Sequence, residues 1–456
     1  MKKLLLLLCA GYAVSAWAQP RLPKNYSWQK LDNGLEVVVI ENHKVPLATI
    51  EIAVRNGAYT EGPEFSGLSH LFEHMFFKAN KVYSDQEKFL KRTQELGAIW
   101  NGTTGNERVN YFFTFDKDSL EAGLLFMNAA IRFPIYREED MQKERPVVDG
   151  EFQRGESDPG FQLWIESNKK VWGDLFTRKN PIGDHDVINS ATPAKMMVIK
   201  DKYYVPNNSL LVICGDVNPQ QAFAMAKRIY GDWEPSAENP HAKFPIPEFT
   251  PLKQPEYFIK ESSIAQTPQM MLTWQGPDVR NDSVATIAAD VFSKLLSLNS
   301  SKWQQALVDK GLASSVYSYY LTSRFVGPIE VGVTPIPGKM KECYEEMIKQ
   351  ISMWGDPNYF TDDELAKAKA GLKRQQIRSN EKPSSLASQL TFHWCSTSLE
   401  YFTDYFPAMD KVTKQDIVNY VNRYIVGKPY VAGMIINKEM NEKHKPSEFF
   451  KSKNQL

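Results

Sequence analysis

The sequence is poor in the residues that mark redox sites and cysteine-bound metals. It has 4 cysteines and 7 histidines among 456 residues, and no two cysteines stand at CxxC spacing. Beyond the first residues, Cys214, Cys343 and Cys395 are an odd and widely spaced set. This pattern predicts neither a disulfide framework nor a cysteine zinc site, and we expect three buried thiols.

Features of nucleotide and nucleic-acid binding are also missing. The 54 basic side chains are balanced by 54 acidic ones, so the formal net charge is zero. There is no lysine- or arginine-rich tract, and neither GxGxxG nor GxxxxGK[ST] occurs. These absences argue against a nucleic-acid partner and against nucleotide use.

Long apolar runs are confined to the beginning of the chain. Lys2 and Lys3 precede the apolar stretch 4–16, and Ala16-Trp17-Ala18 has the small-x-small form of a cleavage site. We therefore predict a signal peptide over residues 1–18 and secretion across the inner membrane, to the periplasm or the extracellular space. Since no later run reaches about 18 apolar residues, we predict no membrane span.

The remaining chain reads as two similar parts. Residues 239–254 are rich in proline and lack helical periodicity, which predicts a linker between an N-terminal domain, 19–238, and a C-terminal domain, 255–456. Thr192 and Thr413 each open a helical pattern that is followed by a tyrosine, a turn and an apolar strand. Strands and helices come in runs, so we predict an α+β fold, with each domain a mixed, mainly antiparallel sheet covered by helices.

The segment His70-Leu-Phe-Glu73-His74 is the strongest indication of chemistry. On a helix the two histidines stand one turn apart on one face, with Glu73 beside them. Such a pair can hold Zn²⁺ while the carboxylate accepts a proton, in the inverted form of the HExxH arrangement, but a third ligand must come from elsewhere. Two ordinary helix histidines beside a solvated glutamate are the alternative.

The third ligand is open on spacing alone. Glu144 and Glu151 are two helical turns apart in one helical segment, so both can face the same way. Pro146 lies between them, interrupts the helical pattern of 138–156 and predicts a kink. The other histidines, including His185 and His393, are isolated in the sequence, and we expect them to play no part in metal binding.

The stretch 35–78, with its Asn-Gly-Leu start, glycine-bearing loop and GLSHLFEHMFFK, resembles the pitrilysin/insulinase family. The resemblance implies one Zn²⁺ per chain, held by His70, His74 and Glu151, with Glu73 as the general base that activates water and Glu144 as a supporting catalytic residue. It also implies that Asn101, Gly102 and Thr103 lie on an edge strand that binds extended peptide. A plain core or hairpin strand is the alternative for that segment.

One feature departs from the family's pattern. Where complete members carry an arginine and a tyrosine, this chain has Val308 and Ser314 or Ser315, although Tyr317, Tyr319 or Arg324 could form a displaced pair. We therefore predict a heterodimer with a homologous chain that supplies the pair, with a homodimer as the alternative. The predicted function is a secreted zinc endopeptidase. The alternative is a zinc-binding, peptide-presenting subunit with little activity of its own.

Overall fold

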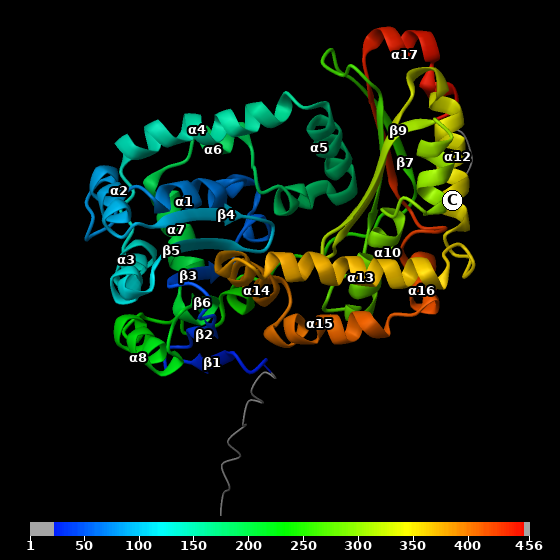
Figure 1. Cartoon of the computed structure of the whole chain (residues 1–456). Coiled ribbons are helices and arrows are strands. Elements are labelled where there is room, and N and C mark those ends of the chain that lie inside the picture. Colours follow the sequence, from blue (N-terminus) through cyan, green and yellow to red (C-terminus); the bar gives the residue numbers. More distant parts are fainter. Residues whose placement is uncertain (1–21, 451–456) are drawn as a thin grey trace, which may run out of the picture.

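A computed structural model describes residues 22–450 of the chain, and its two sheets lie in separate halves of the molecule (Figure 1). The first sheet has six strands in the order β1-β2-β6-β3-β5-β4, in which only β2 and β6 are parallel neighbours. The strands are β1 (Tyr26–Lys30), β2 (Glu36–Glu41), β3 (Leu47–Val54), β4 (Ile99–Thr104), β5 (Val109–Asp116) and β6 (Ser209–Gly215).

The second sheet repeats this plan without the extra first strand. Its order is β7-β11-β8-β10-β9, and again one pair, β7 and β11, is parallel. The strands are β7 (Glu256–Glu261), β8 (Gln269–Gln275), β9 (Ala313–Tyr320), β10 (Pro328–Pro335) and β11 (Val431–Ile436). The predicted fold class, two mixed and mainly antiparallel sheets covered by helices, is thereby confirmed.

The predicted repeat forms the same helix–strand unit in each half. Thr192 caps α7 (Pro193–Tyr203), which leads into β6, and Thr413 caps α16 (Lys414–Tyr424), which leads into β11. Both threonine side chains accept a hydrogen bond from a main-chain N–H in the first turn of the helix, so each stabilises the helix start. The strand that follows is the one that makes the parallel pairing in its sheet.

Each sheet packs most of its own helices on one face. Against the first sheet lie α1 (Leu68–Phe76), α3 (Leu120–Arg132) and α8 (Pro219–Tyr230), and their apolar side chains join Val37, Val39 and Ile52 in one core. Against the second lie α10 (Ser283–Leu296), α12 (Met340–Met353) and α16, around Leu272 and Met434. The alternation of side chains along a strand leaves a second apolar set on the opposite face of each sheet.

That opposite face is covered by a helix from the other half. Helix α14 (Pro383–Ser396), from the second half, packs Leu386, Leu390 and Trp394 against the first sheet. Helix α5 (Pro159–Trp172), from the first half, packs Leu163 against the second sheet. The two halves therefore exchange helices. Figure 1 shows α5 beside the second sheet and α14 beside the first.

The remaining helices complete the description of the chain. They are α2 (Gln86–Glu95), α4 (Glu138–Glu156), α6 (His185–Asn189), α9 (Pro240–Lys243), α11 (Lys302–Gln304), α13 (Asp362–Ser379), α15 (Leu399–Lys411) and α17 (Lys438–His444). The domain boundaries at 238 and 255 stay a prediction, and between them the chain forms only α9 before β7 begins.

Several sequence predictions can be compared with this fold. Cys214, Cys343 and Cys395 are free and buried, as predicted. Helix α4 runs without a break through Pro146 and Gly150, so the predicted interruption is wrong; Met141, Val148 and Phe152 anchor the helix on both sides of the proline. The predicted signal peptide, 1–18, lies outside the described residues, and within 22–450 no helix is long and apolar enough to cross a membrane.

Candidate metal centre

Helix α1 presents His70, Glu73 and His74 from one side, and its start is held by a buried carboxylate. Glu61 accepts hydrogen bonds from the main-chain N–H groups of Gly67 (2.7 Å) and Ser69 (2.6 Å), where the helix dipole favours negative charge. Gly67 has a φ of 85° and meets Gly183 so closely that a Cβ at 67 would lie 2.6 Å from its Cα. Sequence reasoning missed the part played by Glu61, which makes these bonds from a loop.

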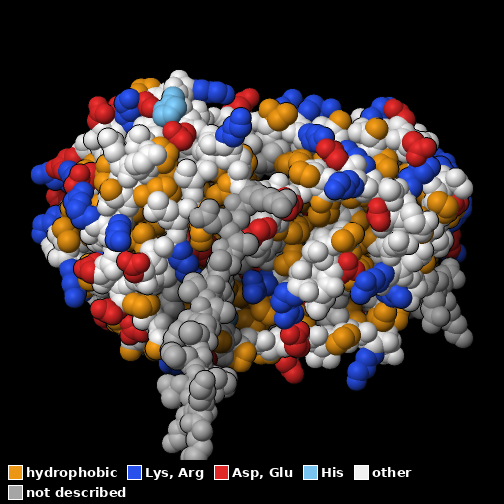
Figure 2. All heavy atoms as spheres, turned by 90° about the horizontal axis from the view of Figure 1, so that it is seen from below, with side chains coloured by type: hydrophobic (Ala, Val, Ile, Leu, Met, Phe, Trp, Pro, Cys, Tyr) orange, Lys and Arg blue, Asp and Glu red, His pale blue; other side chains and the backbone are white. Residues whose placement is uncertain are grey.

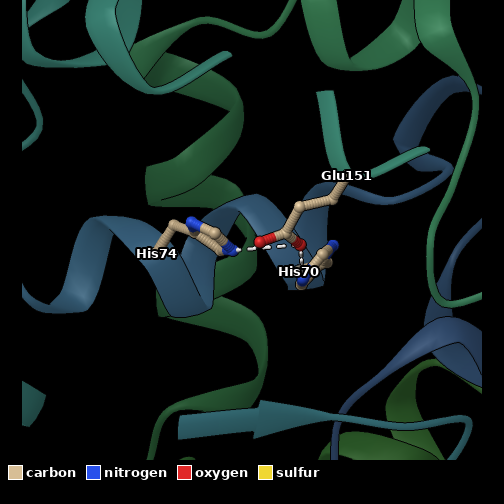
Figure 3. Close-up of side chains that lie close together, drawn as sticks. All are labelled: His70, His74 and Glu151. Carbon is tan, nitrogen blue, oxygen red and sulfur yellow. Dashed lines mark ion pairs between the residues drawn. The ribbon is translucent and has the colours of Figure 1, made fainter. Parts of the chain in front are cut away.

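Helix α4 brings Glu151 to the two histidines. Its Oε2 lies 3.5 Å from Nε2 of His70 and 3.8 Å from Nε2 of His74, as the dashed lines in Figure 3 show. One ligand atom from each of the three residues falls within 4.8 Å of the others. Burial, together with the neighbouring His74, lowers the pKa of His70 to about 4, which keeps its imidazole in the neutral form that binds metals.

Glu144 lies behind this cluster, where it contacts His74. Its Oε1 is 2.8 Å from Nδ1 of His74, and its Oε2 pairs with Nζ of Lys78. Burial alone would raise the pKa of Glu144, but the hydrogen bonds from His74 and Lys78 outweigh it and the pKa is lowered. Position distinguishes the two glutamates that spacing left open: Glu151 lies with the histidine Nε2 atoms, and Glu144 contacts Nδ1 of His74 from the far side.

These residues fit a zinc ion. Two imidazoles and one carboxylate from two helices are a donor set that zinc accepts, and they leave a coordination position open. The contact between His74 Nδ1 and Glu144 leaves Nε2 of that ring facing the cluster, as a metal ligand requires. Nδ1 of His70 is buried and has no hydrogen-bond partner.

Glu73 is buried next to the cluster and is held by β4. Thr104 donates a hydrogen bond from Oγ1 to Oε2 of Glu73 at 2.8 Å. Gly102 of the same strand packs on the side chain, because a Cβ there would lie 2.8 Å from Cγ of Glu73. Burial raises the pKa of the Glu73 carboxyl.

A cavity of about 430 Å³ joins these groups to the edge of the first sheet. Strand β4 is the last strand in the sheet order, so it pairs with β5 on one side only. Strand β4 thus lies at the edge of the sheet, as the resemblance implied, and forms a hairpin with β5; the binding of peptide by this strand stays a prediction. The cavity is lined by His70, Glu73, His74, Phe77, Lys78, Gln86, Trp100, Asn101, Gly102, Thr103, Thr104, Glu144 and Glu151.

Among the described residues of the second half, up to 450, none lines this cavity. Val308 lies in the helical turn Gln305–Asp309, and Ser314 and Ser315 lie on β9. Tyr317, Tyr319 and Arg324, the alternatives for a displaced pair, are likewise absent from its lining. Tyr317 and Tyr319 stand half-exposed on β9, which is the edge strand of the second sheet.

His185 has a partner that its sequence neighbours do not reveal. Its Nδ1 pairs with Asp149 and its Nε2 lies 3.3 Å from Glu156, while its ring stacks on Phe152 at 4.0 Å. All three partners belong to α4, the helix that carries Glu151. These partners are distant from His185 in the sequence and meet it only in the fold, and the expectation that His185 takes no part in metal binding stays a prediction.

Two family models match the chain. Residues 36–168 match insulinase, peptidase family M16, and residues 190–372 match the peptidase M16 inactive domain. The chain belongs to the pitrilysin/insulinase family. The first match contains every residue of the metal centre, and the second covers the part that adds nothing to the cavity.

Relatives and solved structures agree with this family. The zinc protease PqqE of Helicobacter pylori is 25% identical over 426 residues, 92% of this chain and 94% of that protein. The uncharacterized zinc protease YmxG of Bacillus subtilis is 22% identical over 80% of this chain and 86% of that protein. A crystal structure of a protease from Helicobacter pylori has a TM-score of 0.82 at 23% identity, covering 91% of this chain and 100% of that one.

Proposed function

We propose that this chain is a secreted zinc-dependent endopeptidase that cleaves extended peptides or unfolded segments. One observation supports the proposal above all. A single cavity holds a three-ligand cluster, a buried carboxylate beside it and the open edge of a strand. His70, His74 and Glu151 would hold one zinc ion per chain.

Glu73 would act as the general base. A zinc ion supplies an electrophile for the scissile carbonyl and lowers the pKa of the water that attacks it. Oε2 of Glu73 accepts the hydrogen bond from the Thr104 hydroxyl. We therefore assign Oε1 as the atom that would accept the proton from the attacking water. From there the proton passes to the leaving amine, and the raised pKa of the buried carboxyl favours its holding a proton for that step.

Strand β4 would hold the substrate as an added strand. Main-chain groups on its open side can bond to an extended peptide, and Asn101, Gly102 and Thr103 line the same cavity as Glu73. Contacts of this kind recognise the peptide backbone, so we expect a loose preference for side chains. A folded protein would have to expose an extended segment to be cleaved.

A second homologous half is proposed as the partner. The chain resembles the first half of the periplasmic protease PqqL of Escherichia coli, with a TM-score of 0.72, and covers 51% of the whole PqqL chain. We infer a heterodimer with a homologous chain that supplies an arginine and a tyrosine, with a homodimer as the alternative. PqqL is periplasmic, and this similarity, together with the predicted signal peptide at residues 1–18, supports a periplasmic or extracellular location for this chain.

A second function is favoured by Val308 and by Ser314 or Ser315, which stand where the family's arginine and tyrosine would be. The chain would then be a zinc-binding subunit that presents peptides and has little activity without its partner. The same measurements distinguish the two functions, because both require zinc and only one requires turnover by the chain alone.

The test is hydrolysis of a quenched fluorescent peptide library by the purified chain, with zinc content determined in parallel. Glu73→Gln should retain zinc and lose about 10²- to 10⁴-fold in kcat/KM, the range that a general base contributes. Glu87→Gln, at an exposed position on α2, is the matched control and should behave like the unaltered chain.

The outcomes separate the proposals. Zinc in both proteins with turnover only in the unaltered chain supports the endopeptidase. Zinc in both with turnover in neither favours the peptide-presenting subunit. Full turnover by Glu73→Gln would exclude Glu73 as the base.

A further inference from the structure

A second cavity, of about 300 Å³, lies among α10, α13, α14 and α15. Figure 1 shows α13, α14 and α15 side by side at the lower edge of the molecule. Seen from that side, apolar side chains gather over the half that contains the second sheet (Figure 2). No residue lines both this cavity and the metal centre, so its role is separate from the proposed peptidase site.

Aromatic rings dominate one wall of this cavity. Phe392, Phe402 and Tyr405 line the cavity and stand around His393 at ring-centroid distances of 5.4 to 6.1 Å. The faces of such rings carry partial negative charge and attract cations, which is how aromatic cages recognise organic ammonium groups.

Asp290 places a carboxylate in the same cavity. The Tyr405 hydroxyl donates to Oδ2 of Asp290 at 2.7 Å, and within residues 22–450 the Asp290 carboxylate forms no ion pair. No lysine or arginine is among the residues that line the cavity. Burial raises the pKa of Asp290 to about 7, because an ionised carboxylate that is removed from water without a counter-ion is unfavourable. A bound cation would relieve that cost.

His393 adds a neutral hydrogen-bonding group. Its Nδ1 is shielded from solvent and has no hydrogen-bond partner. Burial, and to a smaller extent Arg108, lowers the pKa of His393 to about 4, so the ring is uncharged at neutral pH. A neutral imidazole offers one acceptor nitrogen and does not compete with a cation for Asp290.

We propose that this cavity binds a small organic ammonium ion that carries an aromatic or apolar group. The ammonium group would face Asp290 and the aromatic faces, and the apolar part would contact Phe392, Phe402 and Phe406. An anion is disfavoured because it would meet the carboxylate without a compensating cation. A neutral ligand of the same shape would leave Asp290 without a counter-ion.

Three probes of similar shape test the proposal by isothermal titration calorimetry on the purified zinc-loaded chain. They are 2-phenylethylammonium, the neutral 2-phenylethanol and the anion 3-phenylpropanoate. We expect the ammonium ion to bind at one site, the alcohol to bind at least about tenfold more weakly, and the anion to give no measurable binding. Equal affinity for the first two probes, or no binding of the ammonium ion, would overturn the proposal.

Variants locate the site. Asp290→Asn keeps the shape of the side chain and should weaken binding of 2-phenylethylammonium about tenfold or more. Asp404→Asn makes the same charge change at an exposed position on α15 and should leave it unchanged. Unchanged affinity in Asp290→Asn would place the ligand elsewhere and refute the assignment. Phe402→Leu, which removes one ring and keeps an apolar side chain, provides a second variant if Asp290→Asn does not fold.

Discussion

At the scale of single residues, the metal centre consists of a cluster and the groups that orient it. Glu151 faces the histidine Nε2 atoms, while Glu144 contacts only the far nitrogen of His74 and the amine of Lys78. A ring held in this way loses less freedom when it binds a metal, and its basicity is raised by the carboxylate behind it. The two glutamates of α4 therefore differ in their contacts, although they lie two turns apart on the same face of one helix.

Replacing Glu144 by alanine tests that difference. We expect the affinity for zinc to fall about 10- to 100-fold, since His74 loses the carboxylate that orients it and Lys78 is left beside the ligands. Competition with a zinc chelator of known affinity measures the change. Glu139→Ala, exposed in the first turn of the same helix, is the control. An affinity equal to that of the control would show that Glu144 does not support the site.

At the scale of elements, the proposed base is positioned by the contact between α1 and β4. Thr104 donates to Glu73 from one end of β4, and Gly102 leaves room for its side chain. The strand that would bind the peptide thus also positions the carboxylate that would act on it. A larger side chain on this strand should therefore slow the catalytic step and leave the proposed metal ligands in place.

Gly102→Ala is the matching experiment. The added Cβ would lie 2.8 Å from Cγ of Glu73, so that side chain must shift. We expect kcat/KM to fall about ten- to a hundredfold with zinc content unchanged, because a displacement of about 1 Å costs that much in catalysis. Gly105→Ala, in the turn after β4, meets nothing closer than 3.9 Å and serves as the control. Equal activity in both variants would contradict the prediction.

At the scale of the whole molecule, the halves are joined by more than a linker. Besides the exchanged helices, the hairpin residue Glu107 accepts hydrogen bonds from the main-chain N–H groups of Arg324 (2.7 Å) and Phe325 (3.0 Å) in the second half. Lys179, from the first half, donates to the carbonyl of Val326 at 2.8 Å. Burial lowers the pKa of this lysine to about 8, and the carboxylate of Glu107 opposes that shift.

Glu107→Ala should therefore destabilise the molecule as a unit. Removing the carboxylate leaves the main-chain N–H groups of Arg324 and Phe325 without an acceptor, which costs about 1–3 kcal/mol of unfolding free energy for each buried group. Urea denaturation followed by tryptophan fluorescence should show one transition at a lower midpoint. Glu238→Ala, at an exposed position, should leave the midpoint in place. Two separate transitions, or a midpoint like that of the control, would mean that the halves are not coupled through this contact.

The sequence predicted those features that depend on near neighbours in the chain. The spacing of His70, Glu73 and His74 places them on one helix face wherever the helix lies, because 3.6 residues make one turn. The helix–strand units opened by Thr192 and Thr413 were readable for the same reason, since capping and alternation are local. The repeat predicted two similar domains, and the runs of strands and helices predicted the α+β class.

Only the tertiary structure decided the features that join distant segments. Spacing could not separate Glu144 from Glu151, because both face the same way on α4 and only the packing of that helix on α1 distinguishes them. The partners of His185, the exchange of α5 and α14 and the cavity around Asp290 share this property. Each is a contact between segments far apart in the chain. Such contacts leave no local pattern in the sequence, and they form only when folding brings the segments together.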